Sequence, residues 1–195
     1  MTEPPPRRHV HDAELLRALA HPLRVELLGH LLSVGGGTAT ECASAVGSTA
    51  SNCSWHLRQL ERFGLVERSE GGNSRERPWR ATAVGLDFGR LDDDPATRAA
   101  QLGVLGASLA EEDLLTQRFL DTVGEQPSHW RDAAVLNGYS LRITPDELTA
   151  LTDAVDRLIR PYVSAIRADA PDDARVVHAG LRAFLRLDAQ GRPSA

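Results

Sequence analysis

The sequence predicts a mainly helical protein with a small amount of β structure. Four short helical patterns, broken by proline or glycine, fill residues 12–64. Two extended segments follow at 65–82 and are joined by a Gly-Gly pair. Longer helical patterns return after residue 95. Because apolar residues recur mostly at helical spacing, helices should dominate the chain.

The bulk composition is that of an ordinary globular protein. A length of 195 residues accommodates one domain or two small ones. The 42% hydrophobic and 25% charged content excludes large-scale disorder. No apolar run approaches the ~20 residues of a membrane helix. The N-terminal "MTEPPPRRHVHD" lacks the apolar core of a secretory signal, and its prolines predict a flexible arm over residues 1–11.

The cysteines indicate a reducing compartment, and the charges divide the chain into a balanced first half and an acidic second half. Cys42 and Cys53 fall at apolar positions of predicted helices, which favours reduced core thiols in a cytoplasmic protein over a disulfide or metal site. Residues 1–90 carry 11 arginines against 10 acidic residues, whereas residues 91–195 carry 11 against 17. The acidic balance predicts that the second half does not touch nucleic acid. Every cation is arginine, which suits bidentate phosphate and guanine contacts or reflects a GC-rich coding sequence.

The first two helices have clear start signals. Asp12 is the expected N-cap of "AELLRALA". "HPLRVELLGHLL" then reopens a helix, with Pro22 in the first turn, where its missing N–H costs nothing. "SVGGG" breaks the chain after it. These signals predict two consecutive short helices before residue 37.

The third and fourth helices are also short. "TATECASAVG" should begin near Thr38 or Thr40 and end at Gly47. "STASNCSWHLRQLERFG" follows at 48–64, capped by its first serine or threonine and stopped by its glycine. Its apolar side is Cys53, Leu57 and Leu60. At ~100° per residue, four residues occupy the opposite side: Ser51, Trp55, Arg58 and Arg62.

A β-hairpin completes this region. "LVERSE" and "RERPWRAT" read as extended segments around the turn "GGNS". Two helices joined by a tight turn and followed by a hairpin make a winged helix-turn-helix. The fourth helix fits the major groove of DNA, and wing arginines can reach phosphates or the minor groove. The candidate DNA contacts are Ser48, Thr49, Ser51, Asn52, Trp55, His56, Arg58, Arg62, Arg75 and Arg77. His56 has a second interpretation, contact with a neighbouring helix.

These motifs resemble one family of bacterial regulators. "LLRALAHPLRVELLGHL", "ASAVGSTASNCSWHLRQLERFGLVERSEGG" and "RERPWRAT" are similar to the ArsR-type (arsenic-repressor-like) winged-helix proteins over residues 12–88. The resemblance implies a cytoplasmic, nucleoid-associated homodimer that binds a double-stranded DNA operator, most often as a ligand-responsive repressor. Its recognition helix corresponds to residues 49–63. Thr38 and Thr40 stand where metal-sensing members carry cysteines, and hydroxyls are poor ligands for soft metals, so no metal or other cofactor is expected.

Two other functions, an enzyme and a protein-interaction module, fit the sequence less well. No nucleophile–base set or phosphate-binding glycine loop is recognisable, so an enzyme is not expected. Winged helices also serve as protein-interaction modules without sequence-specific DNA binding. Such a module would show an apolar patch on the fourth helix, where this chain has arginines and only one tryptophan. The arginines favour the DNA-binding regulator.

The second half, residues 91–195, is expected to dimerise and to sense an effector. "LDDDPATR" ends the winged-helix domain at residue 90, and a long helix should run from Pro95 to Val123. A strand at 139–144, an amphipathic helix at 144–166 and a strand at 175–187 should form a small α+β layer.

Aromatic residues raise two questions in this sequence. Those of the second half line an apolar pocket for a small organic effector or simply form core. They are Trp130, Tyr139, Tyr162 and Phe184. Trp55 is either exposed in the free protein and contacts DNA, or it folds back over the aliphatic stems of Arg58 and Arg62.

Overall fold

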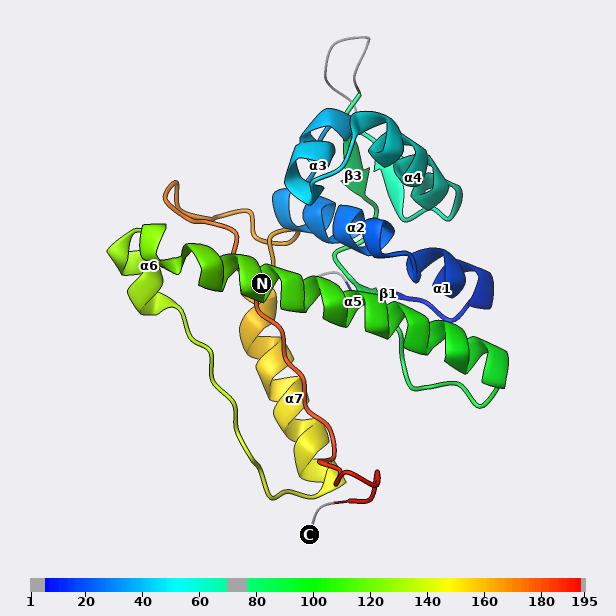
Figure 1. Cartoon of the computed structure of the whole chain (residues 1–195), viewed down its shortest axis with the longest axis vertical. Coiled ribbons are helices and arrows are strands. Elements are labelled where there is room, and N and C mark those ends of the chain that lie inside the picture. The colour runs from blue at the N-terminus through cyan, green and yellow to red at the C-terminus, as the bar shows by residue number, and fades with distance from the viewer. Residues whose placement is uncertain (1–5, 70–76, 194–195) are drawn as a thin grey trace.

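A computed structural model of the protein describes residues 6–69 and 77–193. Four helices form its first unit: α1 (Ala13–Leu19), α2 (Pro22–Val34), α3 (Ala39–Val46) and α4 (Ala50–Arg62). Figure 1 shows them together on one side of the long helix α5. All four lie where the sequence predicts helices.

The helix ends follow the predicted capping chemistry. The Asp12 carboxylate accepts the backbone N–H of Leu15, and Pro22 occupies the first turn of α2. Thr38 caps α3 and exchanges hydrogen bonds with Glu41, which identifies it rather than Thr40 as the start signal. Gly47 ends α3 in the left-handed conformation that glycine adopts without a Cβ penalty.

The wing is the antiparallel hairpin that the sequence predicts. Strand β2 (Val66–Arg68) pairs with β3 (Trp79–Ala81). Gly37, between α2 and α3, exchanges two backbone hydrogen bonds with Trp79 at 2.7 and 2.8 Å. The wing is thereby fixed to the loop that precedes α3. The predicted turn "GGNS" lies outside the described residues.

Two strands were not expected. β1 (Arg8–His9) pairs in parallel with β4 (Leu86–Asp87), and Val10 beside it is buried. The Arg8 guanidinium also donates to the carbonyls of Phe63 and Gly64. The flexible-arm prediction is therefore wrong for residues 8–10, because the buried Val10 side chain, the pairing with β4 and the Arg8 guanidinium attach them to the winged-helix unit.

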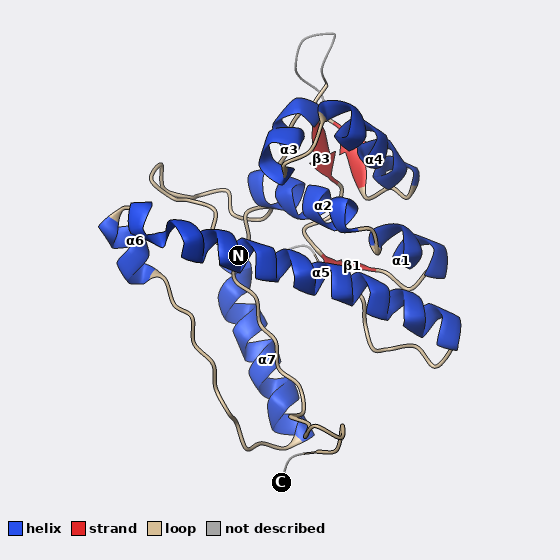
Figure 2. Ribbon diagram, viewed as in Figure 1, coloured by secondary structure: helices blue, strands red, loops and turns tan. Residues whose placement is uncertain are grey.

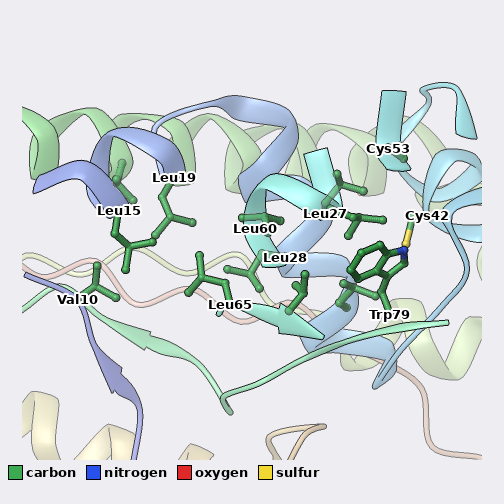
Figure 3. Close-up of a cluster of buried hydrophobic side chains, with 14 of the residues drawn as sticks. Val10, Leu15, Leu19, Leu27, Leu28, Cys42, Cys53, Leu60, Leu65 and Trp79 are labelled. Carbon is green, nitrogen blue, oxygen red and sulfur yellow. The ribbon is translucent and has the colours of Figure 1, made fainter. Parts of the chain in front are cut away.

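The core of this unit is continuous and well filled. Its largest buried side chain is Trp79, which comes from the wing and belongs to one cluster with leucines of α1, α2 and α4 and with Cys42 and Ala43 of α3. Figure 3 shows the Cys42 side chain beside the Trp79 ring. Cys42 and Cys53 are both buried and free, which confirms their prediction as small core residues. Burial raises the pKa of the Cys42 thiol to about 11.

Helix α5 (Pro95–Thr122) is the longest element and confirms the predicted long helix. It begins after Asp94, whose carboxylate accepts the backbone N–H of Thr97. Its first half packs against α1 and α2, where Ala100 and Val104 join the core. Figure 1 shows α5 extending well past the winged-helix unit toward α6.

The remaining elements are short or isolated. They are η1 (Val123–Glu125), α6 (Ser128–Ala133), α7 (Pro145–Ile159) and η2 (Arg160–Tyr162). The predicted capping box of Thr144 and Glu147 begins α7. The α-helix ends earlier than predicted because Pro161 lacks the N–H that would continue it. None of the helices within the described ranges is long and apolar enough to cross a membrane.

The two strands predicted in the second half are absent. Residues 134–144 and 175–186 contain no strand, and Figure 2 shows them as extended loops. Apart from a single bridge between Leu187 and Pro193, no ladder forms among the described residues beyond 91. A β-strand needs an adjacent strand to accept and donate its backbone hydrogen bonds, and neither segment is paired with another strand. The expected α+β layer is therefore replaced by helices and irregular chain.

Candidate nucleic-acid interface

The start of α4 presents a group of short polar side chains. Thr49 caps the helix by accepting the backbone N–H of Asn52 at 3.2 Å. The Asn52 side-chain amide donates to the Ser48 hydroxyl at 3.1 Å, and Ser51 is exposed beside them. Backbone N–H groups and the positive end of the helix dipole make such a helix start favourable for a phosphate.

The polar face of α4 carries two exposed arginines. Arg58 donates to the Ser54 hydroxyl at 3.1 Å, and Arg62 donates to the Gln59 side-chain carbonyl at 3.3 Å. Both hydrogen bonds are on the surface and are made to neutral groups of the same helix, so little is lost when a guanidinium exchanges its partner for phosphate or a base.

The wing adds positive charge close to this face. The Arg68 guanidinium lies 3.6 Å from the Trp79 ring centroid. Burial lowers the pKa of Arg68, Glu61 raises it, and the nearby charges of Arg58 and Arg77 lower it. Arg58 on α4, Arg68 on β2 and Arg77 at the start of the second wing segment therefore lie close to one another, with Glu61 beside them. Arg75 lies outside the described residues.

Arg80, also on the wing, is engaged elsewhere. Its guanidinium forms an ion pair with Glu67 across the hairpin at 2.6 Å, and both side chains are largely exposed. This pair links β2 to β3. Within the described part of the chain, the other two wing arginines, Arg68 and Arg77, are exposed and form no ion pair.

Trp55 is half exposed, with 50% of its surface open. Its ring meets the edge of His56 at 4.7 Å between centroids, and the Arg24 guanidinium lies 5.7 Å from its centroid. The ring therefore contacts Arg24 of α2 and His56 of its own helix. The other half remains available to a partner.

The structure corrects the direct DNA contact expected of His56. The side chain is only 5% exposed, its Nδ1 accepts a hydrogen bond from Arg24 Nε at 3.3 Å, and its ring lies 4.4 Å from that of His21. Burial lowers the pKa of His56, and the charges of His21 and Arg24 lower it further, so the ring is neutral near pH 7. The second interpretation, contact with a neighbouring helix, is the one observed.

Arg24 is the residue that the sequence analysis missed. It bonds His56, donates to the Ala18 carbonyl at 2.8 Å and lies over Trp55, so it connects α1, α2 and the recognition face. Because Arg24 lies in the first turn of α2, directly after Pro22, its sequence position could have predicted the contact with the end of α1. Sequence spacing gives no sign of its contact with α4, which is distant along the chain.

A cavity of about 1090 Å³ lies on the side of α2 toward the second half of the chain. Two of the four predicted pocket aromatics, Trp130 and Tyr162, line it. Tyr139 and Phe184 do not, because they lie in the unpaired extended segments with 78% and 79% of their surface exposed. The predicted set of four is therefore wrong as a single pocket.

The comparisons with known proteins identify the type of the first unit. Residues 19–69 match a family model described as a helix-turn-helix domain. They span α2, α3, α4 and β2, so the chain contains a helix-turn-helix domain in which α3 and α4 are the last two helices. A comparison with curated proteins gave no match.

Two solved structures are similar to the chain at a low level. The YusO protein from Bacillus subtilis is 14% identical, with 76% of this chain and 84% of that chain covered and a TM-score of 0.32. A mutant of Lactococcus lactis ZitR in the apo form is 16% identical, with 76% and 87% covered and a TM-score of 0.30. Scores this low do not establish a shared overall fold.

Proposed function

We propose that this chain is a sequence-specific, DNA-binding transcriptional regulator of the ArsR type that acts as a homodimeric repressor in the cytoplasm. The helix-turn-helix domain at 19–69 makes DNA binding the expected activity. The observation that carries the proposal is the joint placement of exposed Arg58 on α4 and Arg77 on the wing, where the Arg68 guanidinium donates to the Arg77 carbonyl at 2.5 Å. Together they provide one group for the major groove and one for the adjacent backbone.

The two sites have different roles in this proposal. Arg58, exposed on the groove-facing side of α4, reads a guanine through a bidentate contact. Arg77 holds a phosphate and positions the domain without reading sequence. Ser51 and Asn52, near the helix start, supply short donors and acceptors for the backbone or base edges.

The homodimer rests on the exposed apolar residues of α5. One face of α5 is buried against α1 and α2 through Ala100, Val104 and Ala107. The other carries exposed leucines at helical spacing: Leu102, Leu105 and Leu109. A leucine stripe of this kind packs well against its own copy. Two copies joined here would present two α4 helices, as a palindromic operator with half-sites about 34 Å apart requires.

The test begins with selection of bound fragments from genomic DNA by the purified protein. Affinity for the best fragment and for unrelated DNA is then measured at several salt concentrations. Arg58→Ala should weaken binding to the selected fragment by about 1–3 kcal/mol and leave binding to unrelated DNA nearly unchanged. Arg77→Ala should weaken both and reduce the salt slope by about one.

Arg157→Ala is the matched control, since this arginine is exposed on α7 in the other half. It should change neither affinity nor the salt slope. Failure to enrich any fragment over random DNA would contradict the proposal. Retention of a protein partner in place of DNA would favour the interaction-module alternative.

A further inference from the structure

The end of α1 has a carbonyl group that its own helix cannot satisfy. In an α-helix the Ala18 carbonyl would accept the backbone N–H of the residue four positions later, and that residue is Pro22, which has no N–H. The Arg24 guanidinium supplies a donor instead, with its Nη1 2.8 Å from the Ala18 oxygen. Basic side chains near a helix end commonly bond the last carbonyls in this way. Arg24 is therefore held in place from α1.

The same guanidinium also reaches α4. Its Nε donates to Nδ1 of His56 at 3.3 Å, and the His56 ring is buried. Figure 1 shows α2, which carries Arg24, between α1 and α4. The guanidinium lies 5.7 Å from the centroid of the half-exposed Trp55 ring as well. One side chain thus connects the end of α1 with the middle of the helix that faces DNA in the proposed function.

The hydrogen bond from Arg24 determines where the His56 ring carries its proton. A guanidinium donates and never accepts, so Nδ1 must be unprotonated and the neutral ring has its hydrogen on Nε2. A charged imidazolium has a hydrogen on both nitrogens and would place a donor against a donor. Protonation of His56 therefore breaks this bond and brings two positive groups together.

The surroundings of His56 also oppose a charge on its ring. The ring of His21, which precedes α2, lies 4.4 Å away between centroids. Burial lowers the pKa of His56, and the charges of His21 and Arg24 lower it further. Among the described residues, no carboxylate forms an ion pair with His56. The charged residues of α3 and β2, which also pack against α4, have other partners: Glu41 bonds Thr38, Glu67 pairs with Arg80, and Arg68 lies over Trp79.

We propose that Arg24 and His56 form a positioning pair, which holds α4 in the placement that DNA binding requires and which a proton on His56 releases. Arg24 acts through His56 and Trp55, and the buried His56 acts from behind the exposed face of α4. Once His56 is charged, α4 is less firmly fixed against α2, and the DNA-binding placement is less populated. The positioning role rests on the proposed function, whereas the proton-sensitive contact is a property of the free protein.

The first test needs no DNA. Nitrogen NMR of the full chain follows the His56 imidazole between pH 8 and pH 4.5. The neutral ring should carry its hydrogen on Nε2 and titrate below the ~6.5 of an unperturbed histidine. Arg24→Gln removes a positive charge and should raise the pKa of His56, whereas Arg24→Lys keeps the charge and should leave it low. A hydrogen on Nδ1, titration at or above ~6.5, or an unchanged pKa in Arg24→Gln would overturn the proposal.

The second test measures affinity for the selected DNA fragment from pH 7.5 to pH 5.0 at constant salt. His56→Asn keeps an acceptor near the position of Nδ1 and cannot take up a proton; His56→Gln serves if that variant melts abnormally. The neutral ring is favoured in the bound state, so affinity should be lost as the pH falls through the pKa of His56. Relative to His56→Asn, the wild type should lose at least about threefold in affinity over this range.

His129→Asn is the matched control, since this histidine is exposed on α6. Its pH profile should follow that of the wild type. Equal profiles for the wild type and His56→Asn would overturn the role of the proton. A profile of His129→Asn that matched His56→Asn would overturn the assignment to His56.

Arg24 variants separate positioning from a merely structural role. Arg24→Gln should weaken DNA binding at pH 7.5 and flatten the pH profile, and Arg24→Lys should lie between this variant and the wild type. A lower melting temperature with an unchanged pH profile would overturn the positioning role. The expected NMR titration without DNA binding at any pH would reject the proposed function, and with it the positioning role, and leave the proton-sensitive contact intact. DNA binding with one pH profile in all variants would overturn the positioning role alone.

Discussion

The two halves of this chain differ in how completely they bury their apolar residues. Every buried side chain among the described residues lies between Val10 and Ala107. Beyond residue 107, large apolar side chains such as Tyr139 and Phe184 are mostly exposed. The helix α7 contributes no buried residue either.

The difference indicates which half folds by itself. The winged-helix unit, with the first half of α5, fills a core from four helices, the wing and Val10 after β1, so it needs no other surface. The second half has helical and extended segments with apolar faces but no common core. Many of its large apolar side chains are exposed, and such side chains gathered in one patch would mark an interaction site. We infer that the first half carries the stability and the second half acquires its packing from a second copy or a ligand.

The largest expected effect tests this inference with two aromatic residues. Trp79→Ala removes the largest buried side chain and should lower the free energy of unfolding by about 3–5 kcal/mol. Phe184→Ala, in an exposed segment, should change the unfolding of the winged-helix unit by less than about 0.5 kcal/mol. Denaturation followed by circular dichroism, at a concentration where the chain is monomeric, measures both. Similar losses for both variants would show that the second half shares the core.

The outcome of the sequence predictions follows the same division. Helices α1 to α4 could be placed because their signals are local: Asp12, Thr38 and Pro22 at the starts and Gly47 at an end. The strands at 139–144 and 175–187 could not, because β structure depends on a neighbour that no local pattern specifies. The apolar residues that suggested these two strands are exposed in the structure.

The candidate sites divide in a similar way. The exposed face of α4 followed from helical geometry, so Arg58, Arg62 and Trp55 were placed on the surface from the sequence. The contact of His56 with Arg24, and the cavity lined by Trp130 and Tyr162, arise between elements far apart in the chain. Only tertiary packing brings such groups together, so sequence spacing contains no signal for them.

The next effect sharpens the comparison at the α5 stripe. The protein should sediment as a dimer, and the double substitution Leu105→Glu with Leu109→Glu should raise the dimer dissociation constant by at least about 100-fold, because it places charges in an apolar seam. Analytical ultracentrifugation across a concentration series measures this. Leu91→Glu, at an exposed leucine outside α5, is the control and should leave the dimer intact. A wild-type monomer of 21.2 kDa at micromolar concentration would refute the dimer.

A smaller effect concerns Trp55, an exposed apolar residue in the well-packed half. If DNA covers its free side, Trp55→Ala should weaken binding to the selected fragment by about 1–2 kcal/mol while the melting temperature barely changes. If its contacts with Arg24 and His56 matter most, the melting temperature should fall and DNA affinity should hold. Comparing melting curves with DNA affinities distinguishes these outcomes. Trp55→Phe keeps much of the apolar surface and should lie between wild type and alanine.

The smallest effect uses the same local chemistry in both halves. Thr38 before α3 and Thr144 before α7 form equivalent capping boxes: each hydroxyl accepts an N–H at 3.2 Å, and each returning glutamate accepts the threonine N–H at 2.7 Å. Replacing either threonine by alanine removes about 1 kcal/mol of helix stabilisation.

In the first half α3 is part of the core, so Thr38→Ala should lower the free energy of global unfolding by that amount. In the second half α7 opens by itself, so Thr144→Ala should instead raise hydrogen exchange of the α7 amides about fivefold and leave global unfolding unchanged. Thr38→Ser and Thr144→Ser retain the hydroxyl and should behave like the wild type. If both alanine variants lowered the free energy of global unfolding equally, the two halves would unfold as one unit. The smaller burial of the second half would then not make it less stable than the first half.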